Sequence, residues 1–162
     1  MTPAVLASRA RRLTASEWRV LAESALLALA VEAALHVASL ARILRAVERP
    51  VTAATPIDRA AAARLARLSR WPWRLLPLRS TCLRVALVQV MVLRRRQLPA
   101  VVRFGVRRAA DGELEFHAWA DCGGPLEDDS AATYRAFEPA PVAAISRSVR
   151  WSSPGAPPPF EA

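Results

Sequence analysis

The sequence predicts an α+β fold, with helices in the first half of the chain and a small antiparallel sheet in the second. Residues 15–69 are rich in Ala, Leu and Arg with apolar residues at helical spacing, whereas residues 101–121 alternate between apolar and polar. The chain has 162 residues, of which 53% are hydrophobic, enough to bury a real core. We divide it into a helical N-terminal extension (1–70), an α+β core (71–150) and a proline-rich tail (151–162) that we expect to be disordered.

Two helix-start signals stand in the first half. Thr14-Ala-Ser-Glu17 has the form of a capping box and predicts a helix over about 15–47, which can contain a break and which Pro50 ends. Thr55-Pro56-Ile57-Asp58 predicts a second helix, with Thr55 as cap, Pro56 at the first helical position and Asp58 answering from the third. We expect this helix to continue to about Ser69.

The second half predicts one helix and a hairpin. The prolines of residues 71–77 predict an irregular connection, after which Ser80 or Thr81 caps a helix over about 82–96. The expected buried stripe of that helix consists of Leu83, Leu87, Val90 and Met91.

Two strands, over 101–107 and 113–121, are joined by a turn at Asp111-Gly112, and Gly123-Gly124-Pro125 predicts a further turn. A third strand is expected around 142–149. The apolar faces of the two strands are expected to hold Val102, Phe104 and Val106, and Leu114, Phe116, Ala118 and Ala120. His117 and Trp119 then lie on the opposite face.

The net charge of +9 comes with 23 basic residues, all of them arginine and spread along the chain. This charge favours acidic partners without indicating nucleic acid. Two cysteines without a secretory signal predict reduced thiols and a cytoplasmic protein. Within residues 20–44 the longest run without a charged residue or a histidine, 24–31, falls far short of the ~20 residues that span a bilayer, so we expect no membrane contact.

The residues that can carry chemistry are Cys82 and His117. A thiol in the first turn of a helix gains thiolate character from the unpaired N–H groups and the helix dipole, and Cys82 is expected there. His117 lies mid-strand on the face opposite the apolar set and can take the proton of the thiol. A third group would orient the imidazole, and four carboxylates lie within reach in the sequence: Asp121, Glu127, Asp128 and Asp129. Periodicity does not choose between them.

A series of segments in order and spacing resembles one known family. The segments are Ser80–Leu87, Leu93–Pro99, Arg103–Arg107 and His117-Ala118-Trp119, within residues 71–129. They resemble the transglutaminase-like (papain-like) cysteine peptidases that remove the leader in lasso-peptide maturation. The resemblance implies Cys82 as nucleophile, His117 as base and Asp129, a dozen residues later after a glycine turn, as the orienting carboxylate. A slip of one residue in the loop would exchange Asp129 for Asp128.

The resemblance also implies substrates and partners. The substrate would be the leader–core junction of a ribosomally made precursor peptide, and a cyclase would close the macrolactam on the released core. Residues 1–70 show helix signals and no strand hairpin, so the chain resembles the free-standing peptidase, with leader recognition by a separate protein. No cofactor and no metal are implied. The alternatives are an amide-transferring transglutaminase-type enzyme and a non-catalytic docking subunit, and Cys122 has no assigned role.

Overall fold

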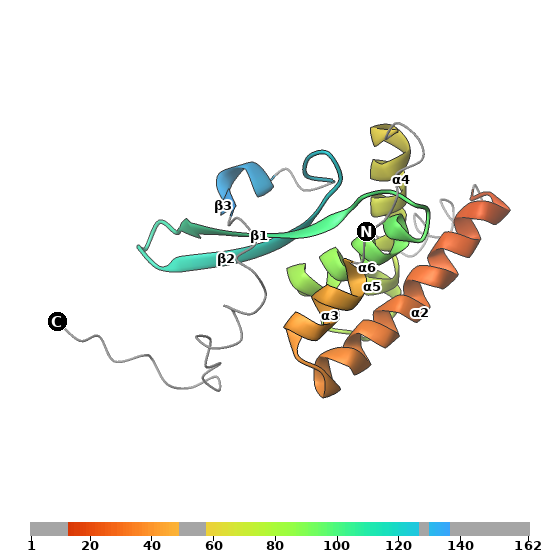
Figure 1. The fold of residues 1–162 in the computed structure, drawn as a ribbon, viewed down its shortest axis with the longest axis horizontal. Helices are drawn as coiled ribbons and strands as arrows, with labels where there is room; N and C mark the ends of the chain where they lie inside the picture. Colours follow the sequence, from red (N-terminus) through yellow and green to blue (C-terminus); the bar gives the residue numbers. More distant parts are fainter. Residues whose placement is uncertain (1–12, 49–57, 127–129, 137–162) are drawn as a thin grey trace.

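A computed structural model describes residues 13–48, 58–126 and 130–136 of the chain. It has an α+β architecture, in which helices pack together at one end and a three-stranded antiparallel sheet lies beside them (Figure 1). The elements are α2 (Ala15–Val37), α3 (Leu40–Val47), α4 (Arg59–Ser69), α5 (Pro72–Leu75), α6 (Cys82–Arg94), β1 (Val101–Arg108), β2 (Leu114–Asp121), the 3₁₀ turn η1 (Ala131–Thr133) and β3 (Arg135–Ala136).

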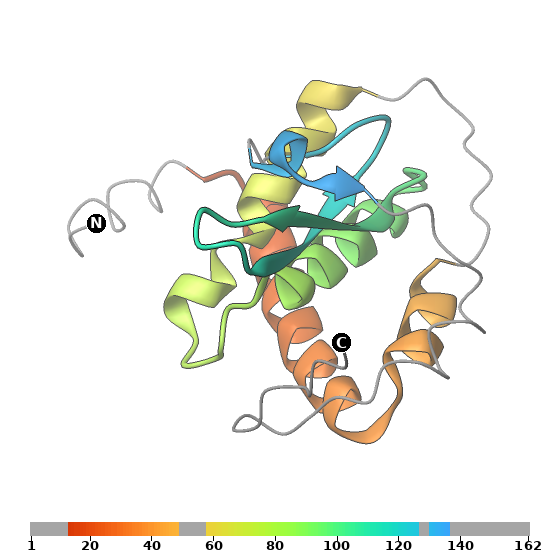
Figure 2. The ribbon, with the colours of Figure 1, turned by 90° about the vertical axis from the view of Figure 1, so that its left-hand side faces the viewer.

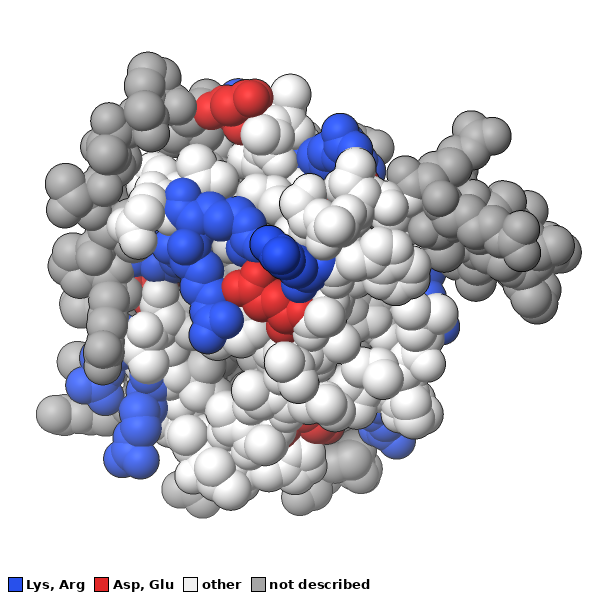
Figure 3. Space-filling model, turned by 90° about the vertical axis from the view of Figure 1, so that its right-hand side faces the viewer, with Lys and Arg blue, Asp and Glu red and all other residues white. Residues whose placement is uncertain are grey.

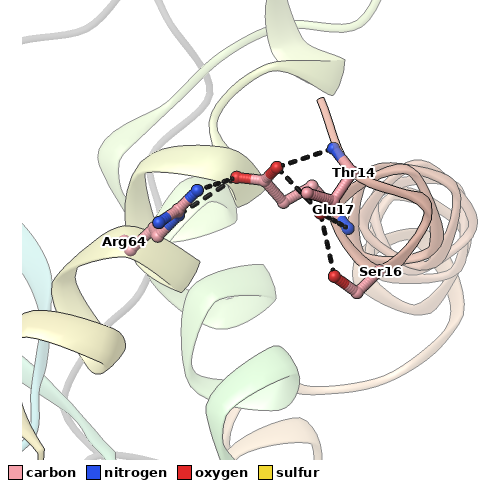
Figure 4. A network of polar contacts seen from close by, with 4 residues as sticks. All are labelled: Thr14, Ser16, Glu17 and Arg64. Carbon is pink, nitrogen blue, oxygen red and sulfur yellow. Dashed lines mark hydrogen bonds and ion pairs between the residues drawn. The ribbon is translucent and has the colours of Figure 1, made fainter. Parts of the chain in front are cut away.

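The capping box predicted at the start of the first helix is confirmed. Thr14 is the N-cap of α2, its hydroxyl accepts from the N–H of Glu17, and the Glu17 carboxylate accepts from the N–H of Thr14 at 2.9 Å. Arg64 of α4 also binds this carboxylate, at 2.6 Å, which ties two helices together (Figure 4). The bond from the Thr14 N–H and the bond from Arg64 lower the pKa of Glu17 to about 2. The expected break is also present, because the helix ends at Val37 and α3 begins at Leu40.

The predicted start of the second helix is wrong by one turn. Asp58, expected at the third helical position, is itself the N-cap of α4, and its Oδ1 accepts from the N–H groups of Ala60 and Ala61 at 2.9 and 3.1 Å. Thr55, the expected cap, lies outside the described residues. An aspartate side chain accepts from the unpaired N–H groups of a helix start as well as a threonine does, so the sequence was compatible with either residue as the N-cap.

The connection predicted to be irregular contains a short helix. Pro72 occupies the first position of α5, where its missing N–H is not needed, and Trp73 is buried in the hydrophobic core. The connection is therefore fixed by the burial of a large aromatic side chain.

The sheet has the strand order β2-β1-β3. β1 and β2 form the predicted hairpin, with Gly105 opposite His117 and Arg103 opposite Trp119, and its turn contains Gly112 at a φ of 89°. β3 pairs with β1 on the other side through Gly105 and Val106. The sequence did not predict β3, and the strand expected around 142–149 lies outside the described residues.

Helix α6 lies at the centre of the fold. It packs against α2 and α4 on one side and against β2 on the other (Figures 1 and 2). The predicted buried stripe is confirmed in part: Leu87 and Val90 are fully buried, but Leu83 and Met91 are only half-buried. Burial continues around the helix, which also buries Ala86, Val88, Gln89, Val92 and Leu93.

Residues of the predicted N-terminal extension belong to the same hydrophobic core as α6 and the sheet. Val20, Leu27 and Val31 of α2 are buried there. Ion pairs reinforce the contact, since Glu23 binds Arg95 and Arg96 at 3.2 and 2.8 Å. The described helices of this region are therefore packed elements of the fold, and the domain border at residue 70 stays a prediction.

The predicted apolar face of β2 is wrong at its outer half. Leu114 and Phe116 are exposed, whereas Ala118 and Ala120 are buried. The hairpin extends beyond the helices, so its outer half has no helix to pack against (Figure 1). Burial on a strand depends on what covers it as well as on alternation.

Helix α2 is long and apolar enough to cross a membrane by length and composition, although a core helix of a soluble protein passes the same test. Six of its residues are buried within the protein: Val20, Leu21, Ser24, Leu27, Ala28 and Val31. The expected lack of membrane contact and the expected cytoplasmic location both stay predictions.

Candidate active site

Cys82 is the first residue of α6, as the sequence predicted, and its side chain is exposed. Of the two candidate caps, Thr81 is the N-cap, and its hydroxyl accepts from the N–H of Arg84 at 3.4 Å. The first N–H groups of a helix have no partner inside the helix, so they surround this thiol with positive partial charges. A helix start of this kind is a general binding site for anionic groups.

His117 stands in the middle of β2 and is half-buried. Because side chains alternate along a strand, Glu115, His117 and Trp119 share one face of β2. Gly105 lies opposite His117 on β1, and the side chains of Trp119 and Tyr134 lie close over this residue, which has no side chain of its own.

Cys82 and His117 line one cavity of about 200 Å³. Trp119 and Leu126 form part of its apolar wall, and Gln89, two helical turns after Cys82, lines it as well. Gln89 is held by a hydrogen bond from its Nε2 to the backbone oxygen of Ala66, at 3.1 Å. The remaining lining residues are Arg70, Ser80, Thr81, Val85 and Ala118. The fold thus brings the exposed thiol and the strand imidazole, 35 residues apart in the sequence, to one hollow.

Two aromatic rings lie beside the imidazole of His117. The ring of Tyr134 stacks on His117 with centroids 4.9 Å apart and planes inclined by 29°. For the ring of Trp119, the centroid distance to His117 is 6.0 Å and the angle between the planes is 23°. Tyr134, the single tyrosine of the chain, follows η1 and directly precedes β3. Sequence reasoning missed Tyr134, because the pairing of β3 with β1 places it near His117 and no local pattern signals that pairing.

Of the four candidate carboxylates, the structure describes one. Asp121 accepts from the N–H of Gly124 at 3.1 Å, so it stabilises the glycine turn. Glu127, Asp128 and Asp129 lie outside the described residues, and the orienting role of Asp129 stays a prediction. Leu126, which directly precedes them, lines the cavity.

The turn before these carboxylates is anchored to α4. Arg59 donates hydrogen bonds to the backbone oxygens of Gly123 and of Pro125. Gly124 has a φ of 127° and a side chain there would collide with the Arg59 guanidinium, 2.6 Å from the position of a Cβ. The predicted glycine turn is confirmed, and Arg59 fixes the path of the chain towards Leu126.

Cys122 is buried, whereas Cys82 is exposed. Its side chain is fully buried, and this burial, assisted by the negative charge of Asp121, raises the pKa of its thiol. A buried, protonated thiol is a poor nucleophile. Within the described ranges, no group of three or more His, Cys, Asp and Glu side chains is placed to hold a metal ion.

Comparison with known proteins identifies the family. The model of the transglutaminase-like superfamily matches residues 25–142, a span that includes both Cys82 and His117. Searches of curated proteins and of solved structures gave no match. Since the match covers more than half of the chain and the fold is α+β, the chain belongs to the transglutaminase-like superfamily.

Proposed function

We propose that this protein is a cysteine peptidase that removes the leader from a lasso-peptide precursor, with Cys82 as nucleophile, His117 as base and Asp129 as the residue that orients His117. The observation that carries the proposal is the shared cavity: an exposed thiol at a helix start and a strand histidine line the same hollow. Membership of the transglutaminase-like superfamily agrees with chemistry at a cysteine. The lasso-peptide substrate is supported by the sequence resemblance alone.

The proposed reaction is amide hydrolysis through an acyl-enzyme. The sulfur of Cys82 attacks the carbonyl carbon at the end of the leader while its proton passes to His117. His117 then gives this proton to the amine of the core peptide, which leaves, and the leader remains as a thioester on Cys82. Water, deprotonated by His117, hydrolyses the thioester and frees the thiol. Backbone N–H groups at the start of α6, including that of Cys82, would hold the oxyanion.

Amide transfer is the second candidate from the same family, since an amine in place of water at the second step would give a transferase. The small cavity does not distinguish water from an amine. The discriminating experiment measures products by mass spectrometry with and without a primary amine. Free leader acid alone supports the peptidase, and a leader amide supports the transferase.

A separate leader-binding protein is proposed as the partner, because a cavity of about 200 Å³ offers few contacts to a long leader. We propose that this partner docks on the apolar outer face of α2, where Trp18, Leu26, Leu29 and Val37 are exposed. Further along the chain in α3, Leu44 is buried and Leu40 is half-buried, so neither adds to this exposed face. Figure 3 shows arginine side chains beside acidic ones and a broad uncharged area on the face of the molecule that it presents.

Precursor cleavage, followed by mass spectrometry, tests the proposed function. Cys82→Ala and His117→Ala should each lower the rate by at least about 1000-fold, because either change disables acylation. The matched controls are Cys122→Ala and His36→Ala, which should change the rate less than about threefold. Wild-type rates in Cys82→Ala would contradict the proposal.

The partner is tested by adding the leader-binding protein to the same reaction. We expect strong stimulation of wild-type cleavage, since docking raises the local concentration of substrate. Leu26→Glu should weaken the stimulation without changing the basal rate, because the Leu26 side chain is 69% exposed. Rapid cleavage by the isolated chain, unchanged by the partner, would contradict the docking proposal.

A further inference from the structure

We propose that Tyr134 is a positioning residue for His117, holding the imidazole in the orientation that transfers a proton to and from Cys82. The inference rests on the proposed peptidase function and adds a residue to it. The ring of Tyr134 stacks on the imidazole at 4.9 Å, but Tyr134 is not among the described residues that line the cavity. Its contact with the proposed base therefore lies outside the lining of that cavity.

A polar network on the same sheet fixes the tyrosine ring. The guanidinium of Arg107 lies over the ring, with its Cζ 4.7 Å from the centroid. Arg107 also binds the carboxylate of Glu115 at 2.6 Å, and the hydroxyl of Tyr134 donates to the same carboxylate at 3.3 Å. Arg107 and Glu115 are opposite residues of the β1–β2 pair, so the hairpin itself supplies this support.

Gly105 of β1 leaves room for the stack because it has no side chain. A Cβ at this position would lie 2.8 Å from the Cβ of Tyr134 and 2.9 Å from Cζ3 of Trp119. Any larger residue would have to displace the side chain of Tyr134 or of Trp119, and the rings of both stack on His117. Because Gly105 is also the β1 residue opposite His117, the bare backbone lets the two rings lie beside the imidazole.

A fixed orientation of the His117 ring should affect the rate of the reaction more than the binding of the substrate. Proton transfer between Cys82 and the leaving amine requires the same ring to meet two partners in succession, and rates fall steeply when reacting groups are misplaced. Stacking restricts the tilt of the ring while leaving its edge, which carries both nitrogens, uncovered by the stacking partner. Losing the stack should therefore lower kcat and leave KM nearly unchanged.

The test compares Tyr134→Phe and Tyr134→Leu in the full chain, with precursor cleavage stimulated by the leader-binding protein. Tyr134→Phe keeps the stack and loses the bond to Glu115, so kcat should fall by less than about threefold. Tyr134→Leu keeps apolar bulk without an aromatic ring, and kcat should fall about 10- to 100-fold at constant KM. The matched control is Phe116→Ala, an exposed aromatic residue of β2 that should leave both constants unchanged.

A second readout does not depend on turnover. The chain has two histidines, so His36 of α2 serves as an internal reference in the NMR spectrum of the imidazole C–H groups. Tyr134→Leu should move the signals of His117, which lose the ring current of Tyr134, and leave those of His36 in place. Gly105→Ala should move the His117 signals as well, because it displaces Tyr134 or Trp119.

The outcomes separate the inference from the proposed function. Cleavage that survives Cys82→Ala overturns the peptidase and the inference with it. Cleavage that requires Cys82 but is unaffected by Tyr134→Leu overturns the inference alone. A rise in KM at constant kcat in Tyr134→Leu also overturns it, because that result would give Tyr134 a role in substrate binding. Unchanged His117 signals in Tyr134→Leu would contradict the stack itself.

Discussion

The two cysteines provide a direct test of which thiol is built to react. Iodoacetamide should alkylate Cys82 at neutral pH while Cys122 remains unmodified. Cys82 is exposed at the first position of α6, and Cys122 is fully buried beside the glycine turn. Alkylation of Cys122 therefore requires the surrounding structure to open.

The difference in rate can be estimated from this burial. A local opening that costs about 3 kcal/mol leaves roughly one molecule in 100 reactive at any moment, and opening of the core costs more. While the structure is closed, the burial that raises the pKa of the Cys122 thiol also keeps that thiol protonated and less reactive. We therefore expect Cys82 to react at least about 100-fold faster than Cys122.

Intact mass over time, followed by peptide mapping, measures both rates. One equivalent should be incorporated in the native protein, and the second only in denaturant. His117→Ala should slow the labelling of Cys82, because the base that accepts its proton is lost, whereas the control His36→Ala should not. Equal rates for the two cysteines, or faster labelling of Cys122, would refute the reasoning.

Three further predictions concern the support of the site. Leu87→Ala should lower the free energy of unfolding by about 2–5 kcal/mol, since Leu87 is fully buried in α6, whereas Leu26→Ala, at an exposed position, should change it by less than about 0.5 kcal/mol; urea titration measures both. Thr81→Ala should cost about 0.5–2 kcal/mol, because it removes the N-cap of α6, and Thr81→Ser should restore most of it in the same titration. Because Glu17 has a pKa of about 2 in the folded protein against 4.5 ordinarily, its carboxylate stabilises the fold above pH 4.5 and loses this effect as the pH falls towards 2. The stability gap between wild type and Glu17→Gln should therefore be full at pH 7 and shrink between pH 4.5 and 2, and a gap that stays constant with pH would contradict this assignment.

Local signals in the sequence predicted much of the fold. The capping box at Thr14, the helix that begins at Cys82 and the Asp111-Gly112 hairpin each depend on residues within a few positions of one another, and each is present. Asp58 shows the limit of such signals, since two registers of capping were compatible with the same four residues.

Features that depend on distant parts of the chain were not predictable in the same way. The exposure of Phe116 follows from how far the hairpin extends past α6, and the stack of Tyr134 on His117 follows from the pairing of a two-residue strand with β1. Neither property produces a periodic pattern of apolar residues in the sequence. The cavity shared by Cys82 and His117 was expected from the resemblance, because spacing alone does not bring a helix start to a strand 35 residues later.

Detection of the acyl-enzyme tests the central claim most directly. The precursor and the leader-binding protein are mixed with the peptidase, the reaction is quenched in acid within its first turnover, and intact mass with peptide mapping locates the adduct. We predict an increase equal to the leader acyl group, on Cys82, that is absent in Cys82→Ala and hydrolyses with time in the wild type. Leader release by Cys82→Ala at the wild-type rate, or an adduct on Cys122, would contradict the account.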